Sequence, residues 1–303
     1  SKKNLGPADV ALVASWLQRP EVMAVVTSIN CLANQFGEDD LATLLTAIEG
    51  TSVRSLCGLT EGQTTADFSG QNLGPIDCKI MAAEYGFQGF IAALNLLTLS
   101  STGDKYNPKT YTLTAGEDKL ELNDKNLGPA DVNLISVWLA TDAGAAVEAV
   151  AIGGNPIGSE GGATLLETIK TSKLKTIDIG KPLPLQEPYV SDTLDLSNTK
   201  MDPGHVLLLS WWLGTEFSAA IDEVNVSHNP IGVDGAKALA EVLPDSSLKC
   251  LIIGPKSTRL PVNDTEVTEL NFEGQDFTPA EVTLVAVAMS TMAAVNCLTL
   301  DMN

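Results

Sequence analysis

A short apolar pair recurs three times between Thr193 and Ile253, and this recurrence constrains the fold more than any other feature of the sequence. The pairs are Leu194-x-Leu196, Val224-x-Val226 and Leu251-x-Ile253. The first two are each followed by a turn and then by apolar residues at helical spacing. One strand and one helix in each unit is the pattern of a solenoid, in which small repeats stack on one another.

A proline at a fixed register marks the start of the longer helices. Proline in the first helical turn loses no hydrogen bond, and its φ angle already suits a helix. An acidic residue two positions later suits the positive helix N-terminus. The sequence therefore predicts a helix at each of five prolines, four of which are followed by an acid. The prolines are Pro7, Pro75, Pro129, Pro203 and Pro279, and the acids are Asp9, Asp77, Asp131 and Glu281.

A second unit begins with NPIG and continues with a small Gly-Ala pair. It occurs at 155–169 and 229–243, with a weaker copy at 34–48. The side-chain amide of the Asn can bind backbone groups at the turn. The Gly-Ala pair is expected to let the helix pack close to the strand layer.

A third unit has a strand but no helix after it. Its strands, such as Ile177-x-Ile179 and Leu251-x-Ile253, lead into connectors at 181–193 and 255–269. Because prolines exclude a helix in these connectors, we expect extended segments there, on the convex side.

The three units together form a super-repeat, which sets the expected domain organisation. First strands at Leu120, Leu194 and Leu270 lie 74 and 76 residues apart. We expect one continuous solenoid over residues 1–303, part of a longer array. The super-repeats span about 1–65, 66–119, 120–193, 194–269 and 270–303.

The copy at 66–119 is short because the second helix is missing after Leu97-x-Leu99. We therefore expect an irregular segment at 97–119, either functional or degenerate. Neither end of the chain shows the polar capping repeat that usually covers a solenoid core. That fits a piece of a longer array, ends covered by a partner, or a chain trimmed for study.

The composition is acidic and narrows the range of partners. The formal net charge is −20, from 18 basic and 38 acidic residues. This disfavours nucleic acid and anionic membrane surfaces, and it favours either basic protein partners or plain solubility. No apolar run is long enough for direct membrane insertion. The five cysteines are scattered without metal-ligand spacing, which predicts buried reduced thiols and favours an intracellular, reducing compartment.

A search for catalytic chemistry finds no constellation of the required residues. His205 and His228 are the two histidines, and neither has a second histidine or a carboxylate at ligand spacing. Both are expected to be solvent-exposed and structural. The glycine cluster at 153–162 recurs in part at 229–235, so it belongs to the repeat and not to a nucleotide loop. The sequence predicts a protein without catalytic, cofactor-binding or metal-binding residues.

The second units resemble leucine-rich repeats of the ribonuclease-inhibitor type. The first matching set is Ile221, Val224, Val226, Asn229, Ile231, Gly235, Ala236, Leu239 and Leu243. The second is Val147, Val150, Ile152, Asn155, Ile157, Gly162, Ala163 and Leu166. The first units depart from the pattern, because Gln71, Lys125, Thr199 and Gln275 stand at the Asn position. The three-unit super-repeat, with LCGL, ADFS and LGP between Leu56 and Pro75, is also similar to expanded repeat proteins of algae and other protists.

This resemblance implies an α/β solenoid with a parallel sheet on its concave face and helices and irregular connectors on its convex face. Members of the family mostly bind other proteins on the concave face, without catalysis. The two-residue period of a strand directs one set of side chains to that face. The resulting partner-binding candidates are Asp67, Glu121, Asp178, Asp195, Asn225 and Asn271. Four of them are acids that attract a basic segment, or simply form a solvated polar face.

Tryptophans add one more candidate contact. Trp16, Trp138 and Trp212 occupy equivalent helix positions, which is typical of packing between layers. Trp211 falls outside that register, and we add it to the partner-binding set as an exposed contact.

Three functions fit these features. The first is a non-catalytic scaffold or adaptor that binds a protein along its concave face. The second is a structural subunit of a large assembly, which contacts its neighbours through its ends and helix-less edges. The third is a regulatory repeat array of a larger enzyme or receptor.

Overall fold

The computed structural model describes residues 4–292 and 294–300 of a mixed α/β fold. Two compact units form within the chain. The first comprises Ser1–Asp118 and Lys125–Val147, and the second comprises Lys119–Asp124 and Glu148–Asn303.

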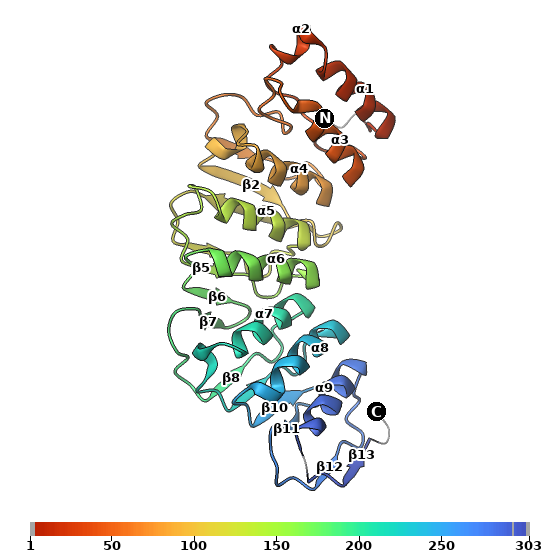
Figure 1. Cartoon of the computed structure of the whole chain (residues 1–303), viewed down its shortest axis with the longest axis vertical. Coiled ribbons are helices and arrows are strands. Elements are labelled where there is room, and N and C mark those ends of the chain that lie inside the picture. The colour runs from red at the N-terminus through yellow and green to blue at the C-terminus, as the bar shows by residue number, and fades with distance from the viewer. Residues whose placement is uncertain (1–3, 293, 301–303) are drawn as a thin grey trace. The chain divides into compact units, whose positions relative to one another are not determined.

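The first unit contains paired helices and one small sheet. Its strands are β1 (Thr65–Asp67), β2 (Leu96–Ser100) and β3 (Thr110–Thr114), of which β2 pairs parallel with β1 and antiparallel with β3. Its helices are α1 (Pro7–Leu17), α2 (Pro20–Met23), α3 (Glu38–Ile48), α4 (Pro75–Gly86), the 3-10 turn Phe90–Ala93 and α5 (Pro129–Leu139). Helix α1 packs against α3, and α4 packs against α5 (Figure 1).

The second unit repeats strands and helices in alternation, and α6 to α9 lie side by side along it (Figure 1). Its helices are α6 (Gly158–Thr171), α7 (Pro203–Leu213), α8 (Gly232–Val242) and α9 (Pro279–Ser290), with 3-10 turns at Glu216–Ser218 and Leu243–Asp245. One sheet holds β4 (Lys119–Glu121), β5 (Ala149–Ala151), β6 (Thr176–Asp178) and β7 (Pro182–Pro184). The next holds β8 (Thr193–Asp195), β9 (Glu223–Asn225), β10 (Cys250–Ile253) and β11 (Thr258–Pro261), and the last holds β12 (Glu269–Asn271) and β13 (Cys297–Thr299).

The proline register predicts the helix starts correctly. Helices α1, α4, α5, α7 and α9 all begin at their proline. The acid two residues later reaches back and accepts a hydrogen bond from the backbone amide that precedes the proline. Asp131 does so from Gly128 at 2.8 Å, and Asp9 does so from Gly6 at 3.0 Å. Each carboxylate satisfies one of the amides that a helix N-terminus leaves unpaired.

The Asn of each NPIG repeat binds backbone carbonyl groups of two strand segments. The sequence predicts the bonds within its own turn. The Asn155 amide donates to the carbonyl oxygen of Ile152 at 2.6 Å and to that of Leu122, in the preceding strand segment, at 2.8 Å. Asn229 makes the equivalent bonds to Val226 and Leu196. These amides therefore tie each strand turn to the one before it.

The expectation of a single parallel sheet is wrong, because the sheets are separate and mixed. Parts of the proline-rich connectors, which we expected on a convex side, instead extend the sheets as edge strands. Strand β7 pairs antiparallel with β6, and β11 pairs antiparallel with β10. Proline lacks an amide hydrogen, so it is tolerated in a sheet on an edge strand. Pro182 and Pro184 accordingly lie in β7, at the edge of its sheet.

The segment at 97–119 is only partly irregular, because a loop at 101–109 joins strands β2 and β3. It forms most of a hairpin in which Leu97 opposes Leu113 and Leu99 opposes Tyr111. The hydroxyl oxygens of Thr98 and Thr112 lie 3.1 Å apart across the strands. With the second helix missing, the chain returns directly as the antiparallel edge strand.

Glycines allow close contacts between helices α6 and α7. The sequence predicts instead that the Gly-Ala pair of the NPIG repeat allows a close contact between helix and strands. A Cβ atom on Gly162 would lie 2.5 Å from the carbonyl oxygen of Gly204, and one on Gly204 would lie 2.2 Å from that of Gly158. The backbones of α6 and α7 therefore meet without intervening side chains.

Equivalent apolar positions differ in burial between α1 and the later helices. Trp138 and Trp212 are buried, which fits packing between layers, whereas Trp16 is 40% exposed. Leu12 is 70% exposed, and its register equivalent Leu208 is 1% exposed. Four cysteines are buried as expected, and the fifth, Cys297, is exposed; none is in a disulfide.

Candidate partner-binding surfaces

The six strand residues singled out in the sequence all occupy one position, the last residue of a three-residue strand. The residue before each of them is buried, so the candidates point to the opposite side. In the second unit Asp195 lies opposite Asn225, while Ala151 lies between Glu121 and Asp178. Asp67 lies opposite Thr98 in the first unit, and Asn271 opposite Thr299 in the second. The acids are thus interrupted by neutral residues instead of forming a continuous ladder.

Five of these side chains hold the turn that follows their strand. Asp195 accepts a hydrogen bond from the Ser197 amide at 3.0 Å, and Asn225 accepts one from the Ser227 amide at 3.0 Å. The same bond, to the amide two residues on, occurs at Asp67, Asp178 and Asn271. Glu121 instead pairs with Lys119 at 2.5 Å. Their local role in the turn fixes the orientation of these side chains.

The turn hydrogen bonds also favour the ionised carboxylates. Hydrogen bonds from Ser69 hold the pKa of Asp67 below its ordinary value, and those from Ser197 do the same for Asp195. Both side chains are exposed. This face therefore presents negative charge at neutral pH.

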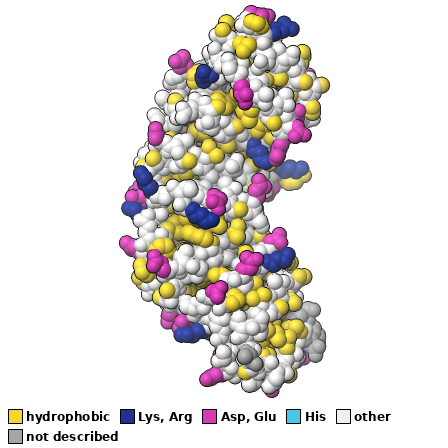
Figure 2. Space-filling view, in the orientation of Figure 1, with side chains coloured by type: hydrophobic (Ala, Val, Ile, Leu, Met, Phe, Trp, Pro, Cys, Tyr) yellow, Lys and Arg dark blue, Asp and Glu magenta, His cyan; other side chains and the backbone are white. Residues whose placement is uncertain are grey.

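Trp211 lies on a helix and not on the strand face. With Leu207 and Val242 it lines a groove of about 420 Å³ between α7 and α8. Two exposed carboxylates, Glu241 and Asp245, line the same groove. Figure 2 shows the side of the molecule that carries the helices, where apolar side chains form patches between scattered charges. We call the groove lined by Leu207, Trp211, Glu241, Val242 and Asp245 the α7–α8 groove.

A groove at equivalent positions lies between α1 and α3, with a volume of about 750 Å³. The registers of the repeats align Ser15 with Trp211 and Thr46 with Glu241. The groove in the first unit therefore lacks the indole and one of the two carboxylates, although Glu49 lines it. The two copies share a position in the fold and differ in chemistry.

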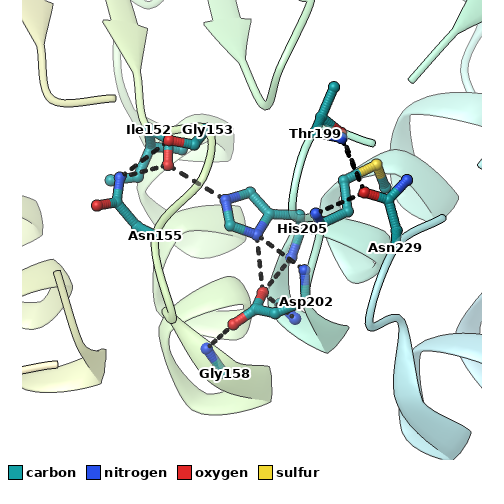
Figure 3. A network of polar contacts seen from close by, with 10 residues as sticks. Ile152, Gly153, Asn155, Gly158, Thr199, Asp202, His205 and Asn229 are labelled. Carbon is teal, nitrogen blue, oxygen red and sulfur yellow. Dashed lines mark hydrogen bonds and ion pairs between the residues drawn. The ribbon is translucent and has the colours of Figure 1, made fainter. Parts of the chain in front are cut away.

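His205 is buried, contrary to the expectation that it is solvent-exposed. It stands where the other proline-led helices carry an acid, and the acid has moved to Asp202, the residue before the proline. The His205 Nδ1 atom lies 2.7 Å from Asp202 Oδ1, and its Nε2 atom lies 3.2 Å from the carbonyl oxygen of Ile152 (Figure 3). Asp202 also accepts a hydrogen bond from the Gly158 amide at 2.6 Å. The network joins two adjacent repeats, and its site is structural.

This network predicts a pH-dependent loss of stability. Burial raises the pKa of Asp202, but the hydrogen bond and charge of His205 and the Gly158 amide outweigh it, so the pKa falls below 3.8. The stabilisation is therefore complete above about pH 3.8 and is lost as the pH falls through the folded-state pKa. Asp202→Asn should reduce the free energy of unfolding by about 1–2 kcal/mol at pH 5, because it weakens charge-assisted hydrogen bonds.

Urea unfolding of the wild type and of Asp202→Asn at pH 5 and pH 2.5 checks this prediction. Groups that do not interact with residue 202 contribute equally to both proteins and cancel in the difference between them. The difference should shrink at pH 2.5, and a constant difference would contradict the assignment.

Two buried carboxylates escaped the sequence interpretation as organising groups. Asp131 accepts hydrogen bonds from the Thr102 amide at 2.8 Å and from the Tyr111 hydroxyl at 3.0 Å, besides capping its helix. Glu84 accepts from the amides of Leu56 and Cys57 at 2.8 and 3.1 Å. The signal for Glu84 was its place at the register position where three other helices carry tryptophan.

Within residues 4–292 and 294–300, no group of three or more histidine, cysteine or acidic side chains is arranged to hold a metal ion. In the same residues, no helix is both long and apolar enough to cross a membrane.

A family model described as Leucine Rich repeat matches residues 221–240. The match supports a leucine-rich repeat protein. It covers β9 and most of α8, the segment with the Asn229 turn and the Gly235-Ala236 pair. No curated protein matches the chain.

Proposed function

We propose that this chain is a non-catalytic interaction module, a scaffold or adaptor, that binds a protein partner along the exposed face of its strands. Leucine-rich repeats generally mediate contacts between proteins. The proposal includes the finer features expected from the sequence: ribonuclease-inhibitor-like repeats, a three-unit super-repeat and a solenoid with the strands on its concave face. It also includes a partner that carries basic groups.

The orientation of the strand-end residues carries this proposal. Asp67, Asp178 and Asp195 each accept a hydrogen bond from the backbone amide two residues on, which fixes the orientation of the carboxylate. Side chains fixed in this way lose little conformational entropy on binding. Negative charge on them favours the approach of a basic segment.

Amide replacements test the proposal without disturbing the turns. Asn keeps the oxygen that accepts the turn hydrogen bond and removes the charge, so Asp67→Asn, Asp178→Asn and Asp195→Asn combined with Glu121→Gln should preserve the fold. We expect at least a tenfold weaker affinity for a partner captured by the wild type from native extract, purified, and measured by calorimetry.

A second set of four amide replacements, outside the strands, provides the control. Glu21→Gln, Asp39→Asn, Glu160→Gln and Asp234→Asn change the net charge by the same amount, from −20 to −16, since each removes one negative charge. Equal affinities of the two variants for the partner would overturn the strand face as the binding surface.

A structural subunit is the second candidate, and the exposed apolar side of α1 favours it. Leu12 and Trp16 are both exposed, although their equivalents in α7 are buried. The same capture experiment separates the two functions. A partner lost on Leu12→Glu but retained by the strand-face variant would support the structural role.

A further inference from the structure

We propose that the α7–α8 groove is a second binding site, which takes an arginine-containing segment of a protein partner. This goes beyond the strand-face function, because the groove lies between two helices and does not include the strands.

The groove offers an aromatic surface with an apolar floor. Trp211 is half-buried, so its side chain packs partly against the protein and still presents a surface to solvent. Leu207, Ala238 and Val242 are also half-buried and line the groove beside it. The volume, about 420 Å³, lies in the range of sites that take small ligands or a few side chains.

The charged groups of the groove are both acidic. Glu241 and Asp245 are exposed, and within the described part of the chain no lysine or arginine forms an ion pair with either of them. The lysines nearest to them in sequence pair with other carboxylates: the Lys237 ammonium lies 3.8 Å from Asp234, and that of Lys249 lies 2.6 Å from Asp222. A cation is therefore the missing counterpart to these two carboxylates.

Arginine fits this combination better than lysine does. Its planar guanidinium stacks on an indole and forms paired hydrogen bonds with a carboxylate. Lysine provides a compact, strongly hydrated charge without the flat surface. An aliphatic residue next to the arginine would fill the floor at Leu207 and Val242.

The first unit supplies an internal comparison. The groove between α1 and α3 occupies equivalent helix positions, but Ser15 replaces Trp211 and Thr46 replaces Glu241. That groove therefore offers neither an indole for a guanidinium to stack on nor a pair of carboxylates. The features that suit arginine are thus specific to one copy and do not follow from the repeat itself.

A second copy of this chain is a poorer occupant than another protein. The chain has three arginines. Arg259 pairs with Glu223, and Arg54 donates to the carbonyl oxygens of Thr51 and Val53. Arg19 is the remaining arginine that a second copy could place in the groove. Sedimentation of the chain without peptide tests whether the chain self-associates in this way.

The experiment uses a fluorescein-labelled peptide, acetyl-Gly-Arg-Leu-Arg-Gly-amide, with the whole chain. Fluorescence polarisation measures affinity, and the indole signals of the four tryptophans in a ¹⁵N spectrum locate the site. We expect the Trp211 signal, assigned with Trp211→Phe, to move while those of Trp16 and Trp138 stay. Trp211→Ala should weaken binding at least tenfold, and Glu241→Gln by about threefold to tenfold.

Three controls make the result decisive. The citrulline version of the peptide, which keeps the shape and loses the charge, should bind at least tenfold more weakly. The lysine version should bind less tightly than the arginine peptide. Asp234→Asn, on the same helix but outside the groove, should leave affinity unchanged.

Several outcomes would overturn the proposal. One is a Trp211 signal that does not move at peptide concentrations up to about 1 mM, which would detect even weak binding. Others are equal binding of the citrulline or lysine peptide, or equal loss with Asp234→Asn. Self-association that Glu241→Gln abolishes would assign the groove to a second copy of this chain. Because Glu241 is exposed, its variant tests the site even if Trp211→Ala unfolds.

Discussion

Asp131→Ala is expected to lower the free energy of unfolding by about 3–5 kcal/mol, because it leaves several donors without an acceptor. The Gly128 amide and the Tyr111 hydroxyl are buried, and both donate to this carboxylate, as do the amide and hydroxyl of Thr102. Each buried donor left unpaired costs about 1–3 kcal/mol. Burial raises the pKa of Asp131, whereas these hydrogen bonds oppose the rise.

Asp9→Ala is the matched control, since Asp9 has the same position in α1. Asp9 is exposed and caps one amide, that of Gly6, so its loss should cost about 1 kcal/mol or less. Urea unfolding gives both values, and hydrogen exchange should show faster opening of the β2–β3 hairpin in Asp131→Ala. A loss no larger than that of Asp9→Ala would show that the shared hydrogen bonds do not stabilise the fold.

Gly204→Ala is expected to cost about 3 kcal/mol, although alanine normally favours a helix over glycine. The added Cβ atom would lie 2.2 Å from the carbonyl oxygen of Gly158 and 2.7 Å from Ile157 Cγ1. Backbone atoms cannot rotate away as side chains can, so α6 and α7 must separate. Overpacking of this kind costs about 1–3 kcal/mol and sometimes more.

Gly86→Ala is the control for the change in helix propensity. Gly86 ends α4, and a Cβ atom there meets nothing within 4 Å, so the variant should be as stable as the wild type or up to about 1 kcal/mol more stable. Thermal unfolding of both variants checks the prediction. If Gly204→Ala were also as stable as the wild type, the close contact between α6 and α7 would not constrain the fold.

The sequence predicted what depends on local rules and missed what depends on distant partners. Proline sets the helix starts and the following acid caps them through bonds to residues three positions away, so both were readable. His205 was misjudged because its burial follows from Ile152, which is 53 residues away in the chain. The exchange of acid and histidine around Pro203 was visible, but not the groups that would surround the ring.

Connector placement failed for a different physical reason. Prolines at 182 and 184 exclude a helix wherever the segment lies, so the extended conformation was predictable. The position of this segment at the edge of a sheet was not predictable, because a strand with prolines can still pair through its carbonyl oxygens. The strand-end residues carried a clearer signal, since Asp67, Asp195 and Asn225 each have a serine two positions on. That spacing is typical of a side chain that closes a turn.

Antiparallel β7 has a consequence for how this chain can change over evolution. It closes the sheet that begins with β4, and β8 opens another, with no backbone pairing between them in the described residues. A whole sheet with its helices can therefore be duplicated or lost without leaving unpaired backbone groups in the adjacent sheet. Cooperative unfolding across that boundary then depends on the packing of α6 against α7 and on the hydrogen bonds of Asp202 and His205 to Gly158 and Ile152. Duplication by sheet, and not by single strand and helix, is the step that this architecture favours.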